Sequence, residues 1–322
     1  MIISRTPFRV SFVGGGSDLK AYYSNNNYGA VVSTAIQKYM YIVIHPYFHD
    51  KIRLKYSITE DVETVDEIKH PIIKACLHKV KLNSGFEITS FADIPSGTGL
   101  GSSSSFTVGL LNALYAFKGK KTTKKQLAEE ACEIEIDILN EPIGKQDQYA
   151  AAFGNINYIK FFKNESVDVL PLNLNESTIK NFESSLRLYY TGNTRKASSI
   201  LIEQKKNMSK KDKIKIMKKI VKLSVDFKNS LIDNNLELAG DLLNKNWSYK
   251  KHMADKISNN YIDKLYSKAL KYGAIGGKLL GAGGTGFLLI MAHDHQLIEN
   301  NMDCRFLKVN IDLIGTKIIY KS

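Results

Sequence analysis

A glycine-serine segment at residues 95–105 constrains the fold of this chain more than any other feature. Glycines alternate with other residues and are followed by a run of serines, at Gly97, Gly99, Gly101 and 102–105. Glycine lets the backbone adopt positive φ and come close to a ligand. An apolar run typical of a strand precedes the segment (86–94), and an apolar helical stretch follows it (106–117). The pattern therefore predicts a loop that joins a strand to a helix.

Such a loop has the chemistry of an anion site. Backbone N–H groups at the first turn of a helix bind anions with the help of the helix dipole, and serine hydroxyls can add a hydrogen bond or a Mg²⁺ ligand. The segment is not a Walker A motif, because the required lysine is absent, and its glycine spacing does not give GxGxxG. A loop that merely caps a helix is the alternative interpretation.

Hydrophobic patterning elsewhere predicts strands, then helices, then strands again. A second helix is expected at 122–139, with Thr122 or Thr123 as its N-cap. Further strands are expected at 8–13, 39–46, within 145–190, at 287–292 and within 305–320, and a helical region at 196–272. This order favours an α+β fold with two domains, at residues 1–180 and 181–322.

Composition narrows the class of protein. The 322 residues carry a formal charge of +13 from 45 basic side chains, most of them lysine. This excess fits a phosphorylated small-molecule partner and equally a lysine-rich genome. The lysine-rich stretch 205–222 also contains apolar residues at helical spacing, so we expect the solvated face of a packed helix rather than a nucleic-acid or membrane partner. The cysteines form no CxxC pair, no signal peptide is evident, and the longest apolar runs are too short to span a bilayer, which together favour the cytoplasm.

Three motifs in order resemble those of the GHMP kinases, a superfamily that includes galactokinase, homoserine kinase, mevalonate kinase and phosphomevalonate kinase. Pro-x-x-x-Gly-Leu-Gly-Ser-Ser, starting at Pro95, resembles their ATP-binding signature. Residues 5–18 resemble the N-terminal substrate motif, and 278–287 the C-terminal glycine motif that steadies the phosphate loop. The resemblance covers almost the whole chain. It implies a two-domain fold with an N-terminal ribosomal-protein-S5-like domain and a C-terminal ferredoxin-like domain.

Details within the motifs resemble one subgroup of sugar kinases. Where galactokinase and mevalonate kinase usually carry Gly-Glu-His, this chain has Gly-Gly-Gly-Ser-Asp at 14–18. Segments 135–149 and 190–195 are similar to kinases of D-glycero-D-manno-heptose 7-phosphate, which make the 1,7-bisphosphate toward GDP-heptose for surface polysaccharide. Asn155 and Thr285 depart from the subgroup's pattern. A kinase of an unphosphorylated sugar such as L-fucose, or a non-catalytic sugar sensor on the same fold, are the alternatives.

The resemblance implies ATP and Mg²⁺ as cofactors. The glycine-serine loop would wrap the triphosphate, through Pro95, Gly97, Thr98, Gly99, Leu100, Gly101, Ser102, Ser103 and Ser104. Ser103 and Glu135 would hold Mg²⁺, with Glu133 as the rival ligand because the helix register is open. Asp147 matches the aspartate that acts as base or orients the acceptor hydroxyl. Arg9 matches the basic residue that keeps this aspartate ionised and offsets charge in the transition state.

The same resemblance implies a sugar-phosphate site. Asp18 would accept hydrogen bonds from sugar hydroxyls, beside Gly15, Gly16 and Ser17. A phosphate at the far end of the sugar would be gripped by Lys145, Thr191, Gly192 and Arg195, since arginine suits bidentate phosphate recognition. Gly283 and Gly284 would line the phosphate loop from the second domain. The expected partners are ATP and a small sugar phosphate, with a homodimer left open.

Overall fold

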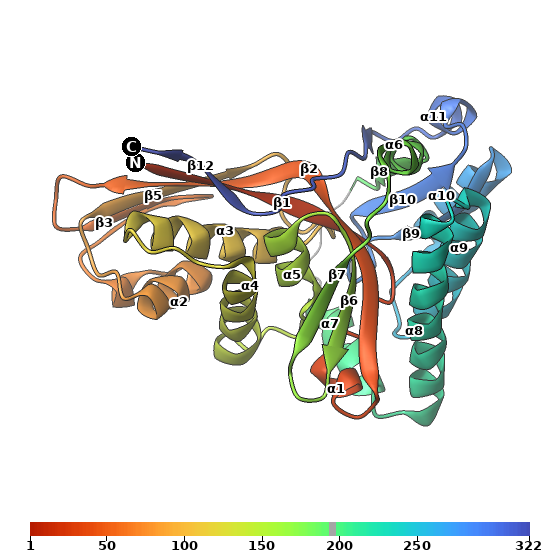
Figure 1. Ribbon diagram of the computed structural model, residues 1–322, viewed down its shortest axis with the longest axis horizontal. Coiled ribbons are helices and arrows are strands. Elements are labelled where there is room, and N and C mark those ends of the chain that lie inside the picture. Colours follow the sequence, from red (N-terminus) through yellow and green to blue (C-terminus); the bar gives the residue numbers. More distant parts are fainter. Residues whose placement is uncertain (193–197) are drawn as a thin grey trace.

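Two β-sheets organise the chain in the computed structural model, which describes residues 1–192 and 198–322 (Figure 1). The first sheet has eight strands, in the order β12-β1-β2-β5-β3-β4, with β6 and β7 on a branch from β2. Its strands are β1 (Ile2–Val13), β2 (Tyr28–Pro46), β3 (Ile52–Lys55), β4 (Thr59–Val62), β5 (Phe86–Ala92), β6 (Ile156–Phe162), β7 (Val167–Pro171) and β12 (Lys317–Lys321).

Strand β2 is the centre of this sheet. It has 19 residues, of which those within 32–44 pair antiparallel with β1 on one edge. On the other edge, residues 28–34 pair with β6 and residues 40–46 pair with β5. One long strand therefore carries two different neighbours, and the sheet splits where the partner changes. Most of the side chains of the β1 run are buried, which places the end of β1 deep in the molecule.

The second sheet is antiparallel, in the order β11-β8-β10-β9. Its strands are β8 (Leu186–Tyr190), β9 (Ala274–Leu279), β10 (Phe287–Ala292) and β11 (Phe306–Lys308). Every residue of β10 is buried, as expected for a continuous apolar run in the middle of a covered sheet.

Helices cover one side of each sheet in Figure 1. Helix α3 packs on β1 and β2, while α9 and α10 pack on β9, and α8 bridges from α9 to β1 and β2. The α-helices are α1 (Lys20–Tyr23), α2 (Pro71–Val80), α3 (Ser102–Phe117), α4 (Lys124–Cys132), α5 (Gln146–Phe153), α6 (Glu176–Ser184), α7 (Ser198–Asn207), α8 (Lys211–Ile232), α9 (Leu236–Lys251), α10 (Asn260–Lys271) and α11 (Gln296–Asn301). A 3₁₀ turn spans Val65–Glu67, and a π-helix spans Glu133–Ile138.

The architecture confirms the predicted α+β class, with two local differences. The helix expected at 122–139 is α4, capped by Thr123, and it runs on as a π-helix instead of staying α-helical. The strand expected at 86–94 ends at Ala92. The proposed domain boundary near residue 180 falls inside α6, between β7 of the first sheet and β8 of the second. Strand β12 then returns to pair with β1, so the two chain ends lie side by side (Figure 1).

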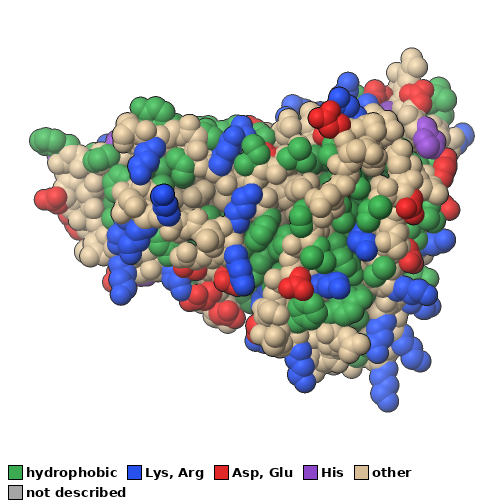
Figure 2. All heavy atoms as spheres, in the orientation of Figure 1, with side chains coloured by type: hydrophobic (Ala, Val, Ile, Leu, Met, Phe, Trp, Pro, Cys, Tyr) green, Lys and Arg blue, Asp and Glu red, His purple; other side chains and the backbone are tan. Residues whose placement is uncertain are grey.

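The lysine-rich stretch 205–222 runs from the end of α7 into α8, where its lysines lie on the outer face. Lys211, Lys215 and Lys218 are exposed, while Met217 and Ile220 are buried. On the face shown in Figure 2, basic side chains are scattered among acidic, hydrophobic and other side chains. No helix among the described residues is long and apolar enough to cross a membrane. The chain's cysteines, Cys76, Cys132 and Cys304, are all unpaired.

Candidate active site

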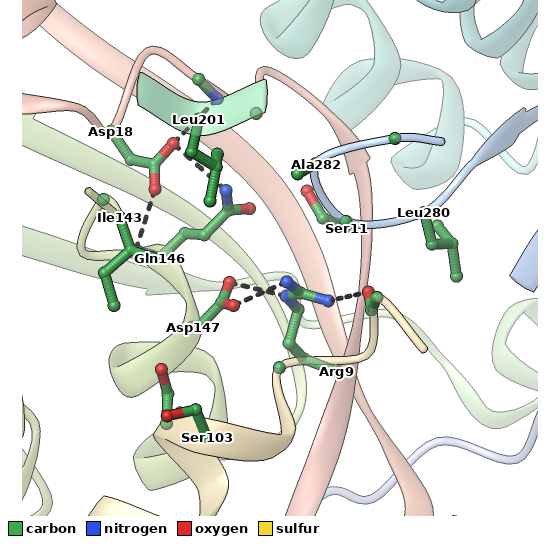
Figure 3. A pocket seen from close by; sticks show the side chains of 18 of the residues that line it. Arg9, Ser11, Asp18, Ser103, Ile143, Gln146, Asp147, Leu201, Leu280 and Ala282 are labelled. Carbon is green, nitrogen blue, oxygen red and sulfur yellow. Dashed lines mark hydrogen bonds and ion pairs between the residues drawn. The ribbon is translucent and has the colours of Figure 1, made fainter. Parts of the chain in front are cut away.

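A cavity of about 600 Å³ lies where the end of β1 and the glycine-serine loop face the second sheet (Figure 3). Residues from distant parts of the chain line it: the β1 end and the following turn, the loop before α3, the start of α5, helices α7 and α9, and the glycine cluster after β9. Residues of all three sequence motifs therefore line the same cavity.

The glycine-serine loop owes its shape to its glycines. Gly97, Gly99 and Gly101 all have positive φ, of 75°, 84° and 74°. A Cβ added to Gly99 would lie 2.8 Å from the carbonyl oxygen of Leu280, so the loop lies directly against the glycine cluster of the second sheet. Gly101 is the N-cap of α3, whose first N–H groups open toward the cavity. An anion bound there would meet both the N–H groups and the helix dipole.

Arg9 and Asp147 form a bidentate pair at the floor of the cavity (Figure 3). Arg9 Nε donates to Asp147 Oδ1 at 2.7 Å, and Nη2 donates to Oδ2 at 2.6 Å. Nη1 donates to the carbonyl oxygen of Gly99 at 2.7 Å. Charge-assisted forks of this kind are strong and hold both planes in register. The guanidinium thus fixes the aspartate and the phosphate-loop backbone relative to each other.

A buried carboxylate lies behind the start of α3. Ser103 Oγ donates to Glu135 Oε1 at 2.7 Å, and Gln148 Nε2 donates to Oε2 at 2.6 Å. Glu135 is fully buried, and this burial raises its pKa to about 7 despite hydrogen bonds from Ser103, Ser104 and Gln148. Its rival Glu133 points the other way and pairs with Lys79 at 2.6 Å. The structure therefore brings Glu135, and not Glu133, to Ser103.

Asp18 accepts hydrogen bonds at the opposite end of the cavity. Gly16 N donates to Oδ1 at 2.9 Å, while the backbone and side-chain amides of Gln146 donate at 3.2 and 3.1 Å. Burial, and next the charge of Asp147, raise the pKa of Asp18. A Cβ on Gly144 would lie 2.0 Å from Asp18 Oδ2, so a residue other than glycine at 144 would displace this carboxylate.

Three buried polar atoms of cavity-lining residues have no hydrogen-bond partner within the part of the chain that the structure describes. They are Ser11 Oγ, Gln146 Oε1 and Gln204 Nε2. Gln204 itself is only 2% exposed. Buried polar groups are normally hydrogen-bonded, because a buried donor or acceptor without a partner costs about 1–3 kcal/mol. The grouping of these atoms around Asp18 is what a site for a hydroxyl-rich ligand requires.

Comparison with known proteins agrees with the three motifs. The family model described as GHMP kinases N terminal domain matches residues 68–155, and the one described as GHMP kinases C terminal matches residues 226–308. The chain belongs to the GHMP kinases. The predicted two-domain fold and the predicted enzyme class, a kinase that uses ATP, are confirmed.

Several relatives of this GHMP kinase match along most of its length. D-glycero-alpha-D-manno-heptose 7-phosphate kinase of Campylobacter jejuni is 29% identical over 299 residues, which cover 89% of this chain and 88% of that protein. The crystal structure of a D-glycero-D-manno-heptose 1-phosphate kinase from Bacteroides thetaiotaomicron superposes with a TM-score of 0.81 at 25% identity over both whole chains. Galactokinase of Lactococcus lactis complexed with galactose shares the fold, with a TM-score of 0.76 at 18% identity over 98% of this chain and 94% of that one.

Several predicted ATP-binding residues of this GHMP kinase shape the loop without lining the cavity. Thr98 is buried and donates to the carbonyl of Pro95 at 3.0 Å. The carbonyl of Leu100 accepts from Arg9 N at 3.0 Å. The loop residues that do line the cavity are Ser96, Gly97, Gly99, Gly101, Ser102, Ser103 and Ser104.

Some of the residues predicted to bind the sugar phosphate line the cavity, and others only support its backbone. Gly15, Gly16, Asp18 and Gly283 line the cavity. Ser17 instead braces the turn by donating to the carbonyls of Gly14 and Ala30, and Gly284 donates its N–H to Ile257.

The described members of the expected phosphate grip, Lys145, Thr191 and Gly192, do not line the cavity. Lys145 Nζ lies 2.5 Å from Glu165 Oε2, so its charge is already neutralised away from the cavity. Thr191 exchanges hydrogen bonds with the backbone of Gly286, and Gly192 is exposed. Arg195 lies outside the described residues.

Two lysines that sequence patterning did not single out, Lys250 and Lys278, line the cavity. A signal for each exists in the sequence. Lys250 continues the buried helical spacing of Leu243 and Trp247 along α9. Lys278 lies within the buried strand β9, where a charge needs a partner.

Proposed function

We propose that this chain transfers the γ-phosphate of ATP to the anomeric hydroxyl of D-glycero-D-manno-heptose 7-phosphate, giving the 1,7-bisphosphate. The observation that carries the proposal is the Arg9–Asp147 pair in a cavity bounded by the glycine-serine loop on one side and Asp18 on the other. The heptose substrate is supported by the names of two relatives that match over most of the chain.

Each side of the cavity suits one reactant. The loop at 97–104 and the N-terminus of α3 present N–H groups to the triphosphate of ATP. Asp18 and Gln146, with the unpaired oxygen of Ser11 nearby, present acceptors and donors to sugar hydroxyls. Gly15 and Gly16 leave the backbone open to a ring at this end. Asp147 lies between the two groups (Figure 3).

Asp147 is proposed to orient the acceptor hydroxyl and take its proton. The hydroxyl oxygen then bonds to the γ-phosphorus while the bond from that phosphorus to the bridging β–γ oxygen breaks, and ADP leaves. Arg9 holds both carboxylate oxygens of Asp147, which fixes the orientation of this carboxylate for the transfer. The remaining N–H groups of Arg9 can offset charge on the phosphoryl oxygens.

The residues behind α3 fit a magnesium ion. Glu135 is a fully buried carboxylate whose hydrogen-bond partners within the described parts of the chain are serine hydroxyls and an amide, with no cation among them. A buried carboxylate is stabilised by a cation, and Mg²⁺ is commonly held by one or two protein oxygens together with substrate phosphates. Ser103 and Glu135 are the residues proposed to hold it. A bound Mg²⁺ would neutralise charge on the phosphates of ATP.

One of the two alternatives has support of its own. Fucokinase relatives from Arabidopsis thaliana and Bacteroides fragilis are 26% identical over 90% and 99% of this chain, although it spans only 30% and 38% of those proteins. A kinase of unphosphorylated sugar such as L-fucose is therefore the second candidate. A non-catalytic sugar sensor is disfavoured by the intact Arg9–Asp147 pair, because a protein that only binds sugar has no need of a fixed base beside a phosphate loop.

The substrate is tested by ADP release from Mg²⁺-ATP by the purified protein. Heptose 7-phosphate, heptose 1-phosphate, free heptose and L-fucose are compared. Turnover that requires the 7-phosphate supports the proposal, and turnover with a free sugar replaces it with the second candidate. Arg195→Ala should cut turnover of the 7-phosphate and leave that of a free sugar, if Arg195 grips the distal phosphate. If the wild-type protein binds a sugar tightly but turns over none of the four compounds, the result would support the non-catalytic sugar sensor instead.

The unpaired cysteines suit a reducing compartment, which supports the cytoplasm as the proposed location. A homodimer and the boundary between domains 1–180 and 181–322 stay predictions.

A further inference from the structure

Lys250 is a buried cation in the cavity wall that the roles above leave unused. It lies on the last turn of α9 and is 6% exposed. Most lysines in proteins keep their ammonium in water, and a buried one requires compensation. A buried lysine at a ligand cavity therefore needs an explanation.

For the other buried lysine of the cavity, Lys278, hydrogen bonds to the backbone provide the explanation. Lys278 Nζ donates to the carbonyls of Ser11 and Phe12 at 2.8 and 3.0 Å. These bonds join β9 of the second sheet to the end of β1 in the first. Lys278 thus acts as a structural tie between the two sheets, and its ammonium is largely used.

Lys250 lacks comparable partners. Its Nζ donates to the carbonyl of Gly281, and no carboxylate of the described residues lies within ion-pair distance of it. Burial, reinforced by Arg9 and opposed by Asp18 and Asp147, lowers the pKa of Lys250 to about 8. With one backbone acceptor for three N–H groups, the ammonium retains donors for an anion that the ligand-free cavity does not supply.

The position of Gly281 shows which anion Lys250 can reach. A Cβ on Gly281 would lie 2.6 Å from the Cα of Gly99, so these two glycines touch. Arg9 Nη1 donates to the carbonyl of the same Gly99. Lys250 and Arg9 are therefore anchored on either side of one contact between the glycine-serine loop and the second sheet. Both cations face the part of the cavity where the loop holds phosphate under the proposed function.

We propose that Lys250 binds the phosphoryl group that is transferred, by donating hydrogen bonds to oxygens of the ATP γ-phosphate beside Arg9. The inference rests on the proposed phosphoryl transfer at Asp147. Lys250 takes and gives no proton in the step: it neutralises charge on the γ-phosphate oxygens as the phosphorus moves from ADP to the acceptor. Burial makes the free ammonium of Lys250 costly, and the same exclusion of water strengthens its attraction for a phosphate once ATP is bound.

The test compares Lys250→Met with Lys251→Met. Lys251 is the next residue of α9, but it is partly exposed and pairs with Asp263 at 3.3 Å. With the acceptor sugar found by the substrate screen, we expect Lys250→Met to lower kcat by about 100-fold, as loss of one oxyanion donor does. The KM for the sugar should change less than about threefold, and Lys251→Met should behave as wild type. Lys250→Arg, which restores a cation, should recover part of kcat.

A binding readout separates this inference from the choice of sugar. Calorimetry with ADP and with the non-hydrolysable imido analogue of ATP needs no acceptor. Lys250→Met should weaken binding of the analogue by about tenfold or more while leaving ADP binding within about twofold. Equal loss for both nucleotides, or none for either, would overturn the assignment. A rise confined to the KM of a sugar phosphate would overturn it as well, by placing Lys250 on the sugar's own phosphate. Lys250→Gln, which keeps a donor for Gly281, is used if the methionine variant does not fold.

Discussion

Arg9 should affect both catalysis and stability, by amounts that its hydrogen bonds allow us to estimate. Its side chain is 5% exposed and makes three hydrogen bonds, two to Asp147 and one to Gly99. Removing one partner of a buried ion pair costs about 3–5 kcal/mol. Asp147 keeps 22% of its side-chain surface, so the lower end applies. For Arg9→Met we therefore expect the free energy of unfolding to fall by about 3 kcal/mol. Separately, we expect kcat/KM to fall by about 100-fold, as loss of one donor to the transition state does.

Arg9→Lys is the intermediate control, because lysine keeps the positive charge but cannot form the bidentate pair with Asp147. One ammonium cannot replace three directed N–H groups, and a charge-assisted hydrogen bond is worth about 1.5–3 kcal/mol. We expect a loss of about tenfold in kcat/KM for this variant. Both values come from steady-state ADP release, with urea unfolding of the same variants as the measure of stability.

A double-mutant cycle with Asp147→Asn tests whether the two residues act as a unit. If Arg9 works through Asp147, the double variant should be scarcely worse than Asp147→Asn alone, and the coupling should exceed about 1.5 kcal/mol. If the losses of kcat/KM in the two single variants add up in the double variant, Arg9 and Asp147 do not act as a unit. Arg9→Met with near wild-type kcat/KM would refute the role of the guanidinium altogether.

Three further predictions test other parts of the site. Gly99→Ala adds a Cβ 2.8 Å from a facing carbonyl and should raise the KM for ATP about tenfold, whereas Gly85→Ala, also at positive φ but with nothing within 4 Å, should leave it unchanged. Glu135→Gln should raise the Mg²⁺ concentration needed for half-maximal rate by about tenfold or more, and Glu133→Gln should not. Burial lowers the pKa of Lys250 from 10.5 to about 8, so between these pH values the unfolded chain binds a proton that the folded chain has released. The free energy of unfolding of the ligand-free protein should therefore rise with pH across this window, with Lys250 contributing up to about 3 kcal/mol. Urea titrations of Lys250→Met should show a smaller rise, because burial also lowers the pKa of Lys278 and that contribution remains.

Sequence patterning predicted most of the fold and, within the site, the glycine-serine loop. Apolar runs marked the strands that became β1, β5 and β10. The signal is clearest for β10, where every residue is buried and none is polar. The glycine-serine loop was predicted because its glycines need positive φ, which no other residue type meets as readily. These are local requirements, and local sequence carries them.

Contacts between distant segments could not be read in the same way. Lys145 matches a family position, yet its ammonium pairs with Glu165, a partner twenty residues away that periodicity does not reveal. Lys250 is one lysine among many in a helical region, and only its place on the buried face of α9 separates it from solvated neighbours. The π-helix at Glu133–Ile138 likewise depends on packing, since the sequence there suits an ordinary α-helix. What escaped prediction was decided by tertiary packing.

The central claim is transfer of phosphate from ATP to the anomeric oxygen at Asp147. ³¹P NMR of the product from heptose 7-phosphate and Mg²⁺-ATP tests it most directly, with Asp147→Asn as the paired variant. The account predicts a new phosphate resonance coupled to the anomeric proton in the wild-type reaction, formed at least about 100-fold more slowly by Asp147→Asn. A new phosphate on another carbon, or equal rates for the two proteins, would contradict it.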